Sequence, residues 1–346
     1  MDLFKNLLIL LLIVAGIIIL GFLITRYLDD INFYPRQLFI PKKEVKVFNP
    51  DNFIWQGFEA NWDIRDAQTV EVFNDKMWLV GGVGGTAPNY SDNKSDIWFS
   101  DNGIKWDLVT DQADWGVKRA HWSVVFKDKM WLLGGVDNRG YINDVWCSED
   151  GINWIQAKDP EWTRRKGHSA VVFNNKIWVV GGVDPSGAVN DVWSSSDGEN
   201  WELVTEHAGW SSRYDLTLTV FDNKMWVTGG VYPGLAGERD VWSSSDGQDW
   251  ELVTDDVLWK GRHGHCLMVY EDRLWILAGW SGLGKAYNDV WYSEDGINWQ
   301  EIPNSPWLGR EDPSCVVFNN KLWIMAGMKT SGERTNDVWC LYDSTN

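Results

Sequence analysis

Tryptophan recurs along this chain at a nearly constant interval, and that interval limits the possible fold more than any other feature. The chain has 26 tryptophans in 346 residues. One set follows a single Met, Ile or Leu in MWLVGG, MWLLGG, IWVVGG, MWVTGG, LWILAG and LWIMAG. Its successive spacings are 53, 47, 48, 49 and 48, and its members are Trp78, Trp131, Trp178, Trp226, Trp275 and Trp323. Three further sets of six keep the same period, so 24 of the 26 tryptophans belong to the repeat. A period near 50 indicates repeated supersecondary units that bury their faces against one another.

Each repeat contains four short segments with strand character. In the third repeat they are Val171–Phe173, Ile177–Val180, Asp191–Trp193 and Trp201–Val204. The turns between them are rich in Asn, Asp and Gly, including the paired Gly181-Gly182 and a recurring S-x-D-G-x-x-W turn. Short β-rich runs bounded by such turns predict antiparallel strands. Four strands per repeat of this length are typical of one propeller blade.

The register of the repeats predicts how the ring closes. The sixth repeat lacks its fourth strand, while DNFIW at 51–55 matches DGINW at 150–154 and precedes any first strand. Pairing these two ends would remove an open sheet edge. We therefore expect an all-β, six-bladed β-propeller over residues 49–346, with residues 51–58 completing the last blade.

Paired glycines after an apolar strand, a downstream tryptophan and this period resemble the kelch-repeat family, including the central domain of galactose oxidase. Four glycine pairs are intact, whereas blades five and six have Ala278-Gly279 and Ala326-Gly327, so the chain resembles a divergent member. The S-x-D-G-x-x-W turn is similar to a shortened Asp-box of sialidases, which is a structural turn in that family. The resemblance therefore implies a folding role for the turn aspartates, which are Asp150, Asp197, Asp246 and Asp295.

An uncharged run at the N-terminus predicts a membrane anchor. Leu7–Thr25 is 19 residues long, which is enough for one helical crossing of a bilayer. We expect a single-pass transmembrane helix within residues 1–30 and a tether over residues 31–48; a cleaved signal peptide would have a shorter apolar core. The Lys/Arg count favours a cytoplasmic propeller, but long domains translocate largely regardless of charge. We favour an extracytoplasmic propeller.

Charge and cysteine content exclude several classes of function. A formal net charge of −18 argues against nucleic acid as a partner. The four cysteines lack metal-ligand spacing and are expected to be buried free thiols: Cys147, Cys266, Cys315 and Cys340. No phosphate-binding loop, dinucleotide fingerprint or nucleophile elbow is present, so we expect no cofactor, no metal and no catalytic residue, and enzyme activity is not favoured.

The two faces of the predicted ring differ in sequence variation. On one face, here called the invariant face, lie the short first–second turns and the S-x-D-G turns. On the other, the variable face, lie the blade connections and the second–third loops, which have 13 residues in blade one and 8 or 9 in the others. Variation concentrated in loops on a rigid scaffold is typical of a binding surface. Since the closing strand runs from the invariant to the variable face, the tether should enter at the invariant face.

A ring of cations is predicted at the mouth of the central channel on the variable face. Its members stand three residues after the fourth set of tryptophans: Arg65, Lys118, Arg165, Arg213, Arg262 and Arg310. Converging guanidinium groups suit carboxylates, and kelch propellers that resemble this chain use such arginines for acidic peptides. The alternative is structural pairing with the aspartates that start the third strands, one per cation: Asp96, Asp144, Asp191, Asp240, Asp289 and Asp337.

The positions beside this ring differ from blade to blade and are stronger candidates for ligand contact. They are Asp66, Arg119, Lys166, Tyr214, His263 and Glu311, followed by Asp215 and Asp312 in two blades. Tyr214 with Glu311 resembles the Tyr–Glu pair of sialidases. Trp280, just after the glycines of blade five, could stack on a sugar or anchor a partner. His121, His168 and His265 share one position, for which a structural role is favoured over metal binding.

Two functions remain open from the sequence. The favoured one is a membrane-anchored interaction module that presents the variable face to a protein or an acidic peptide. The alternative is a propeller that binds or converts a carbohydrate or sugar acid at a cationic channel mouth, similar to sialic-acid mutarotase or to sialidases.

Overall fold

A computed structural model of the chain describes residues 48–87 and 90–345. The predicted anchor at Leu7–Thr25 and almost all of the tether lie outside the described residues. Within the described part, no helix has the length and apolar character to cross a bilayer. Residues 49–346 form one compact unit.

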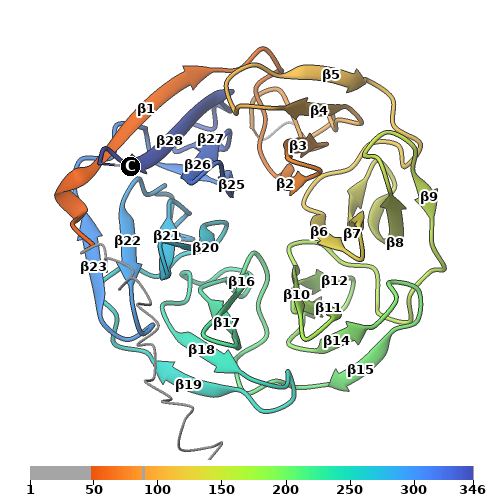
Figure 1. The fold of residues 1–346 in the computed structure, drawn as a ribbon. Helices are drawn as coiled ribbons and strands as arrows, with labels where there is room; N and C mark the ends of the chain where they lie inside the picture. Colours follow the sequence, from red (N-terminus) through yellow and green to blue (C-terminus); the bar gives the residue numbers. More distant parts are fainter. Residues whose placement is uncertain (1–47, 88–89, 346) are drawn as a thin grey trace, which may run out of the picture. The chain divides into compact units, whose positions relative to one another are not determined.

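Six four-stranded antiparallel sheets surround a central channel (Figure 1), which confirms the all-β, six-bladed propeller. Blade one contains β2 (Thr69–Phe73), β3 (Lys76–Val80), β4 (Ile97–Ser100) and β5 (Asp107–Thr110). Blade two contains β6 (Trp122–Phe126), β7 (Lys129–Asp137), β8 (Gly140–Ser148) and β9 (Ile155–Gln156). Blade three contains β10 (Ser169–Phe173), β11 (Lys176–Val180), β14 (Val192–Ser195) and β15 (Glu202–Thr205). Blade four contains β16 (Thr217–Phe221), β17 (Lys224–Thr228), β18 (Val241–Ser244) and β19 (Glu251–Thr254). Blade five contains β20 (Cys266–Tyr270), β21 (Arg273–Leu277), β22 (Val290–Ser293) and β23 (Trp299–Ile302).

The sixth blade joins the two ends of the propeller. It contains β25 (Ser314–Phe318), β26 (Lys321–Met325), β28 (Asp337–Asp343) and, as its outer strand, β1 (Phe53–Glu59). The pairing runs from Phe53 opposite Asp343 to Glu59 opposite Asp337, so β1 enters at the invariant face and ends at the variable one. The predicted closing strand is confirmed, because the open edge of the last blade is covered by the start of the first.

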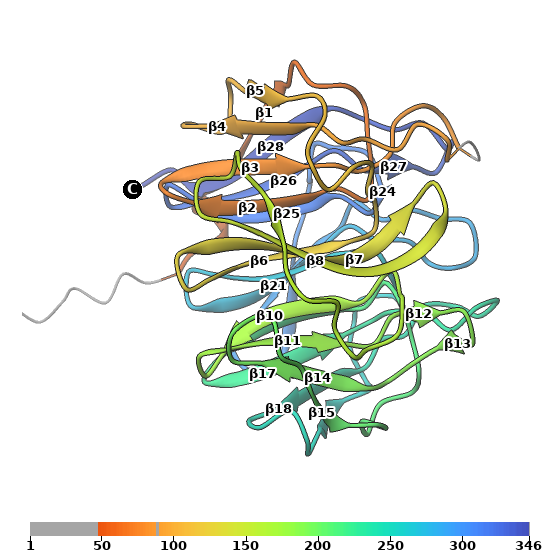
Figure 2. The same ribbon diagram turned by 90° about the vertical axis from the view of Figure 1, so that its right-hand side faces the viewer.

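Short strands mark the variable face. They are β12 (Val183–Asp184) with β13 (Gly187–Ala188), and β24 (Arg310–Glu311) with β27 (Met328–Lys329). Figure 2 shows these pairs at one end of the disc and the C-terminus at the other. At the invariant face every first–second turn has two residues with φ between 46° and 58°, as at Asn174-Asn175. This is the two-residue hairpin turn that favours Asn and Asp.

The S-x-D-G turn is held by its own side chains. In blade three, Ser195 Oγ accepts from the Gly198 amide (2.8 Å), and Asp197 Oδ1 accepts from the amides of Glu199 (2.9 Å) and Asn200 (2.8 Å). The glycine has φ 82°, and a Cβ there would lie 2.3 Å from the Trp131 ring of the preceding blade. The same contact recurs at Gly103, Gly151, Gly247 and Gly296, so in blades one to five the turn packs against the preceding blade of the ring.

The apolar core lies between neighbouring blades. Each of its clusters combines residues of two adjacent sheets; one joins Trp131 and Leu133 of blade two to Ile177 and Val179 of blade three. Burial of this kind is the main favourable term in folding, at about 25 cal/mol per Å² of apolar surface. The repeated tryptophans therefore hold the ring together from blade to blade.

A ring of backbone hydrogen bonds, here called the neck, encircles the channel below its variable-face mouth. One residue per blade donates its amide to the carbonyl of the previous blade at 2.7–3.3 Å, and the six bonds form a closed circle: Ala67, Ala120, Gly167, Asp215, Gly264 and Asp312. All six have φ between 47° and 59°, a conformation that favours Gly and tolerates Asp. The neck places two carboxyl groups, on Asp215 and Asp312, in the channel wall.

The expectation that all four cysteines are free is wrong for two of them. Cys266 and Cys315 form a disulfide, with their Cα atoms 6.0 Å apart. The first strands β20 and β25 are neighbours around the channel, so residues about one repeat apart face each other there. Cys147 and Cys340 are free thiols.

Candidate functional site

The six ring cations are paired with the third-strand aspartates, one pair per blade. The N···O distances are 2.5–2.7 Å in all six. In blade four, Arg213 binds both carboxylate oxygens of Asp240, and its other donors reach the carbonyls of Gly229 and Ser211 and the Ser211 hydroxyl. The same Asp240 accepts from the Trp242 indole at 2.7 Å.

This geometry is that of the structural alternative. The cation side chains are 0–1% exposed, so their donors do not reach the cavity at the channel mouth. A bidentate Arg–carboxylate pair already uses the fork that an anionic ligand would need. The donors of six residues are thus engaged in structural pairs, and the wall of the cavity does not include these residues: Arg65, Lys118, Arg165, Arg213, Arg262 and Arg310.

The non-uniform positions beside the ring meet in one place. A cavity of about 270 Å³ opens at the variable-face end of the channel, and all eight residues singled out beside the ring line it: Asp66, Arg119, Lys166, Tyr214, Asp215, His263, Glu311 and Asp312. We call this cavity the channel mouth. Each of the six first positions forms a single β-bridge to the residue after the glycine pair of its own blade, as His263 does with Trp280. These bridges hold the mouth residues on rigid backbone.

Acidic groups gather on the side of the mouth formed by blades four, five and six. His263, 7% exposed, lies with Nδ1 3.5 Å from a Glu311 oxygen and 3.7 Å from an Asp215 oxygen. Burial and the nearby carboxylates raise the pKa of Glu311 to about 7, and burial with Asp215 and Glu311 holds the pKa of Asp312 well above its usual range. Although burial opposes it, the two flanking carboxylates raise the pKa of His263. This side of the mouth has more carboxyl groups than counter-charges.

Basic groups stand on the side formed by blades two and three. The Lys166 ammonium lies 5.6 Å from the centre of the Tyr214 ring, and the Arg119 guanidinium lies 4.9 Å from that of Tyr90. Among the described residues, neither cation has a carboxylate within ion-pair distance, and Arg119 Nε is buried without a hydrogen-bond partner. Burial lowers the pKa of Arg119, against the opposing attraction of Asp66.

One residue of the mouth, Tyr90, and one residue behind its wall, Arg334, were missed from the sequence. Arg334, from the second–third loop of blade six, donates to Asp66 at 2.9 Å and to the Gly84 carbonyl at 2.9 Å. Tyr90, from the 13-residue loop of blade one, covers the guanidinium groups of both Arg334 and Arg119. The length of that loop was the sequence feature that could have pointed to Tyr90; nothing comparable marked Arg334.

Two residues that the sequence suggested for ligand contact or catalysis, Tyr214 and Trp280, are poorly placed for those roles. Burial, with nearby carboxylates, raises the pKa of Tyr214 to about 12, which makes its phenolate a rarer species than in water. This is the opposite of what a sialidase-like nucleophile requires. Trp280 is half-buried beside the His263 backbone and is not part of the wall of the mouth.

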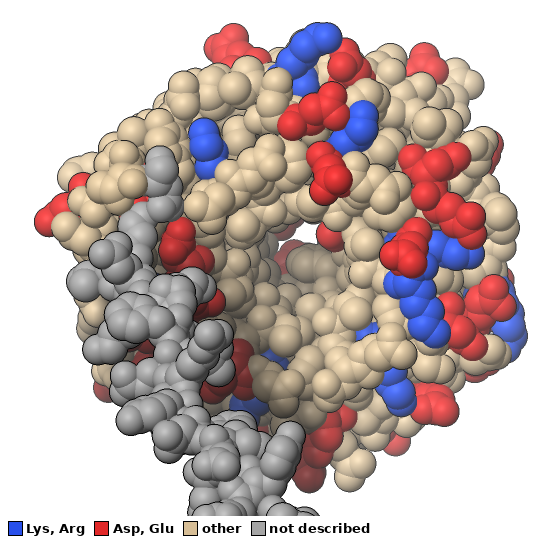
Figure 3. Space-filling model, viewed as in Figure 1, with Lys and Arg blue, Asp and Glu red and all other residues tan. Residues whose placement is uncertain are grey.

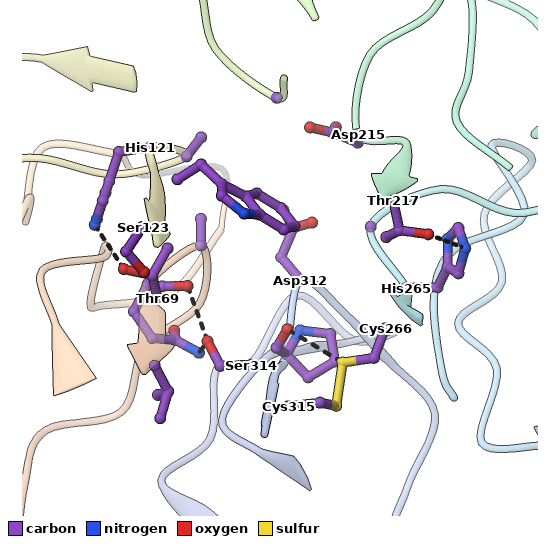
Figure 4. Close-up of a pocket in the computed structure, with 18 of the residues that line it drawn as sticks. Thr69, His121, Ser123, Asp215, Thr217, His265, Cys266, Asp312, Ser314 and Cys315 are labelled. Atoms are coloured by element: carbon purple, nitrogen blue, oxygen red, sulfur yellow. Dashed lines mark hydrogen bonds between the residues drawn. A yellow bond between two sulfur atoms is a disulfide. The ribbon is translucent and has the colours of Figure 1, made fainter. Parts of the chain in front are cut away.

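Below the neck the channel widens into a second cavity of about 170 Å³ (Figure 4). His121 and His265 there bond to the hydroxyls of Thr69 (3.1 Å) and Thr217 (2.7 Å). Burial lowers the pKa of both imidazoles and of His168. No cluster of three potential metal ligands occurs among the described residues. Figure 3 shows the invariant face, with the channel open at its centre.

Apolar side chains are exposed on the second–third loops of blades four and five. We call Tyr232, Leu235 and Leu283, which are 48%, 57% and 77% exposed, the outer loop patch. The two loops touch, because the Gly237 amide donates to the Ser281 carbonyl at 3.1 Å. Large exposed leucines on adjoining loops are typical of a contact surface.

Comparisons with known proteins agree with this architecture. The family model of the KLHDC2/KLHL20/DRC7 kelch-repeats domain matches residues 152–306. A solved structure titled "Structure of YjhT" superposes with a TM-score of 0.67 at 16% identity, covering 81% of this chain and 95% of that one. At that identity the likeness concerns the fold alone. A search of curated proteins found none that matches.

Proposed function

We propose that this chain is a membrane-anchored interaction module whose variable face holds a protein partner. Its six-bladed propeller matches a kelch-repeats family model over residues 152–306, and kelch propellers commonly bind proteins. The observation that carries the proposal is the outer loop patch. Its leucines project from loops that differ between blades, on the face opposite the entry of β1. Such a patch on a rigid scaffold suits a partner that buries apolar side chains.

The anchor and the compartment belong to the same proposal. Leu7–Thr25 is long and apolar enough to hold the propeller at a bilayer. The Cys266–Cys315 disulfide supports an extracytoplasmic propeller, since such bonds persist in oxidising compartments. With β1 entering at the invariant face, the variable face would point away from the membrane.

Site-specific photo-crosslinking in intact membranes tests this function. A photoreactive residue at Leu235 or Leu283 should give one defined protein adduct. The same residue at Ile152 or Ile297, which are about as exposed on the invariant face, should not give it. The adduct must then bind again as a purified protein. Equal adducts from both faces would contradict the proposal.

A second candidate function, binding or conversion of a carbohydrate or sugar acid, is favoured by one observation. The channel mouth combines a 270 Å³ cavity with a carboxyl group, Glu311, whose pKa is raised to about 7 beside His263. A group poised near neutral pH can donate or accept a proton. Titration of the full-length chain with glucuronate and with neutral monosaccharides tests this alternative.

A further inference from the structure

The channel mouth separates charge by sector, and that separation is the starting point. Reading around the ring, blades two and three contribute Arg119 and Lys166, whereas blades four to six contribute Asp215, Glu311 and Asp312. The remaining acid, Asp66, is already paired with Arg334 at 2.9 Å. The mouth therefore has a basic side and an acidic side facing one cavity.

The two sides act on each other only across the cavity, without direct ion pairs between residues that the structure describes: Lys166 opposes the rise in the pKa of Glu311 and of Asp312. No ion pair joins Arg119 or Lys166 to a carboxylate among the described residues, although all of them line the same 270 Å³. His263 lies between Asp215 and Glu311 at ion-pair range, yet its buried Nδ1 makes no hydrogen bond. Basic groups and carboxyl groups that line one cavity without ion pairing leave room for a molecule with both an ammonium and a carboxylate group. Such an ammonium group would favour the ionised forms of Glu311 and Asp312, whose pKa values are raised without it.

Contacts within each side of the mouth explain why its basic and acidic groups stay apart. The Lys166 ammonium is held against the Tyr214 ring and the Arg119 guanidinium against the Tyr90 ring, on the basic side. The acidic side is fixed by the neck, in which Asp215 and Asp312 are locked by backbone hydrogen bonds at 2.7 and 2.9 Å. Each side is thus preorganised, and binding need not first order it.

We propose that the channel mouth binds a small zwitterion of the amino-acid or short-peptide class, with its ammonium group against Glu311 and Asp312 and its carboxylate against Lys166 and Arg119. An ammonium group offers three donors to carboxylate oxygens. A guanidinium fork with a neighbouring ammonium suits a carboxylate. A purely anionic sugar acid would satisfy only the basic side and would lie against three carboxyl groups. The site is distinct from the outer loop patch, so either proposal can fail without the other.

Calorimetric titration of the purified full-length chain with glycine, glycyl-glycine and triglycine tests the inference. At least one of the three should bind. Its N-acetyl and C-terminal amide derivatives, which each lack one charge, should bind about tenfold or more weakly, as expected when a charge-assisted hydrogen bond is lost. The inference is overturned if none of the three binds, if either blocked derivative binds as well as its parent, or if glucuronate binds more tightly than all three.

Two substitutions assign the ends of the ligand. Glu311→Gln should weaken the free peptide and its amide but leave the N-acetyl derivative unchanged, and Lys166→Met should weaken the free peptide and its N-acetyl derivative but leave the amide unchanged. Lys285→Met and Glu333→Gln, on the same face outside the mouth, are the matched controls and should change nothing. The same loss for every derivative in both variants would show that the charges act on the fold and would contradict the assignment.

Discussion

At the scale of single residues, the S-x-D-G-x-x-W turn shows why so many positions repeat. Its aspartate accepts hydrogen bonds within the turn, and these bonds lower the pKa of Asp150 to about 2 although partial burial opposes them. Its glycine packs against the ring of a tryptophan of the previous blade. Both residues therefore make structural contacts, and neither is free for a ligand.

Alanine at the turn glycine should be strongly destabilising. Gly198→Ala adds a Cβ at φ 82° and 2.3 Å from Trp131, so the free energy of unfolding should fall by about 2–4 kcal/mol. Gly116→Ala is the control, because Gly116 has φ 74° but no atom within 4 Å of the added Cβ. Chemical denaturation should show a smaller loss, about 1 kcal/mol, for the control; equal losses would mean that the contact with Trp131 does not matter.

Glu71 makes stability depend on pH. Burial in the channel raises its pKa to about 8, against the opposing hydrogen bond from the Ser123 hydroxyl. The fold therefore binds this proton more tightly than the unfolded chain does, and stability falls as pH rises from about 4.5 to 8.

Glu71→Gln should remove that part of the pH dependence. Its Tm should exceed that of the unmodified chain at pH 9 by more than at pH 5, because the amide cannot ionise. Glu199→Gln, on an exposed turn, serves as the control in thermal unfolding across this range. Parallel Tm profiles for Glu71→Gln and the unmodified chain would contradict the assignment.

At the scale of elements, two sets of interactions hold each blade in place. Both are made by the innermost strands and by the turns that lead into them. One is the buried cation–aspartate pair, and the other is the neck, whose six amides bond around the channel. The pairing could be anticipated from the matching counts of six cations and six aspartates. The neck could not, because a chain of Ala, Ala, Gly, Asp, Gly and Asp has no motif that reveals a backbone ring.

Removing a ring cation should destabilise the blade. Arg213→Ala leaves the half-buried Asp240 with the Trp242 indole as its remaining side-chain donor among the described residues, and should lower the free energy of unfolding by about 3–5 kcal/mol. Lys166→Ala removes a cation from the mouth instead and should lower it by less than about 1 kcal/mol. Urea denaturation of the two variants decides this; similar losses would mean that the ring pairs are not structural.

The disulfide between blades five and six should add measurable stability. Cys315→Ser opens a loop of 49 residues and should lower the free energy of unfolding by about 2–4 kcal/mol. Cys147→Ser, at a free thiol, should change it little. If the reduced and oxidised proteins unfold at the same denaturant concentration, the bond contributes nothing. The spacing of 49 was close to one repeat, so a pairing across neighbouring inner strands was foreseeable once the blades were aligned.

At the scale of the whole molecule, the sequence was sufficient for the architecture because the same physical unit is repeated. Trp, Gly and Asn occupied equivalent places in blade after blade, and the surplus DNFIW segment at 51–55 predicted the closing strand. The eight positions that differ between blades also converge on one cavity. Comparison among repeats thus located the mouth.

The residues that form the wall of the channel mouth were harder to predict. Tyr90 lines it and Arg334 supports it through Asp66, and both come from loops whose paths depend on tertiary packing and not on a local pattern. The ring cations expected at the mouth are absent from its wall, and only geometry reveals that their donors are turned toward aspartates and away from the cavity. The expected cationic mouth is instead divided between a basic and an acidic side.

The proposed function assigns binding to the variable face, opposite the face at which β1 enters, and one measurement tests this assignment most directly. It is the dissociation constant of the partner captured at Leu235 or Leu283, measured with purified full-length variants. Leu235→Glu with Leu283→Glu should weaken binding at least about tenfold, because each charge enters an apolar contact. Ile152→Glu with Ile297→Glu, on the invariant face, should leave the constant unchanged. If the invariant-face pair weakens binding and the variable-face pair does not, the assignment of the binding face is wrong.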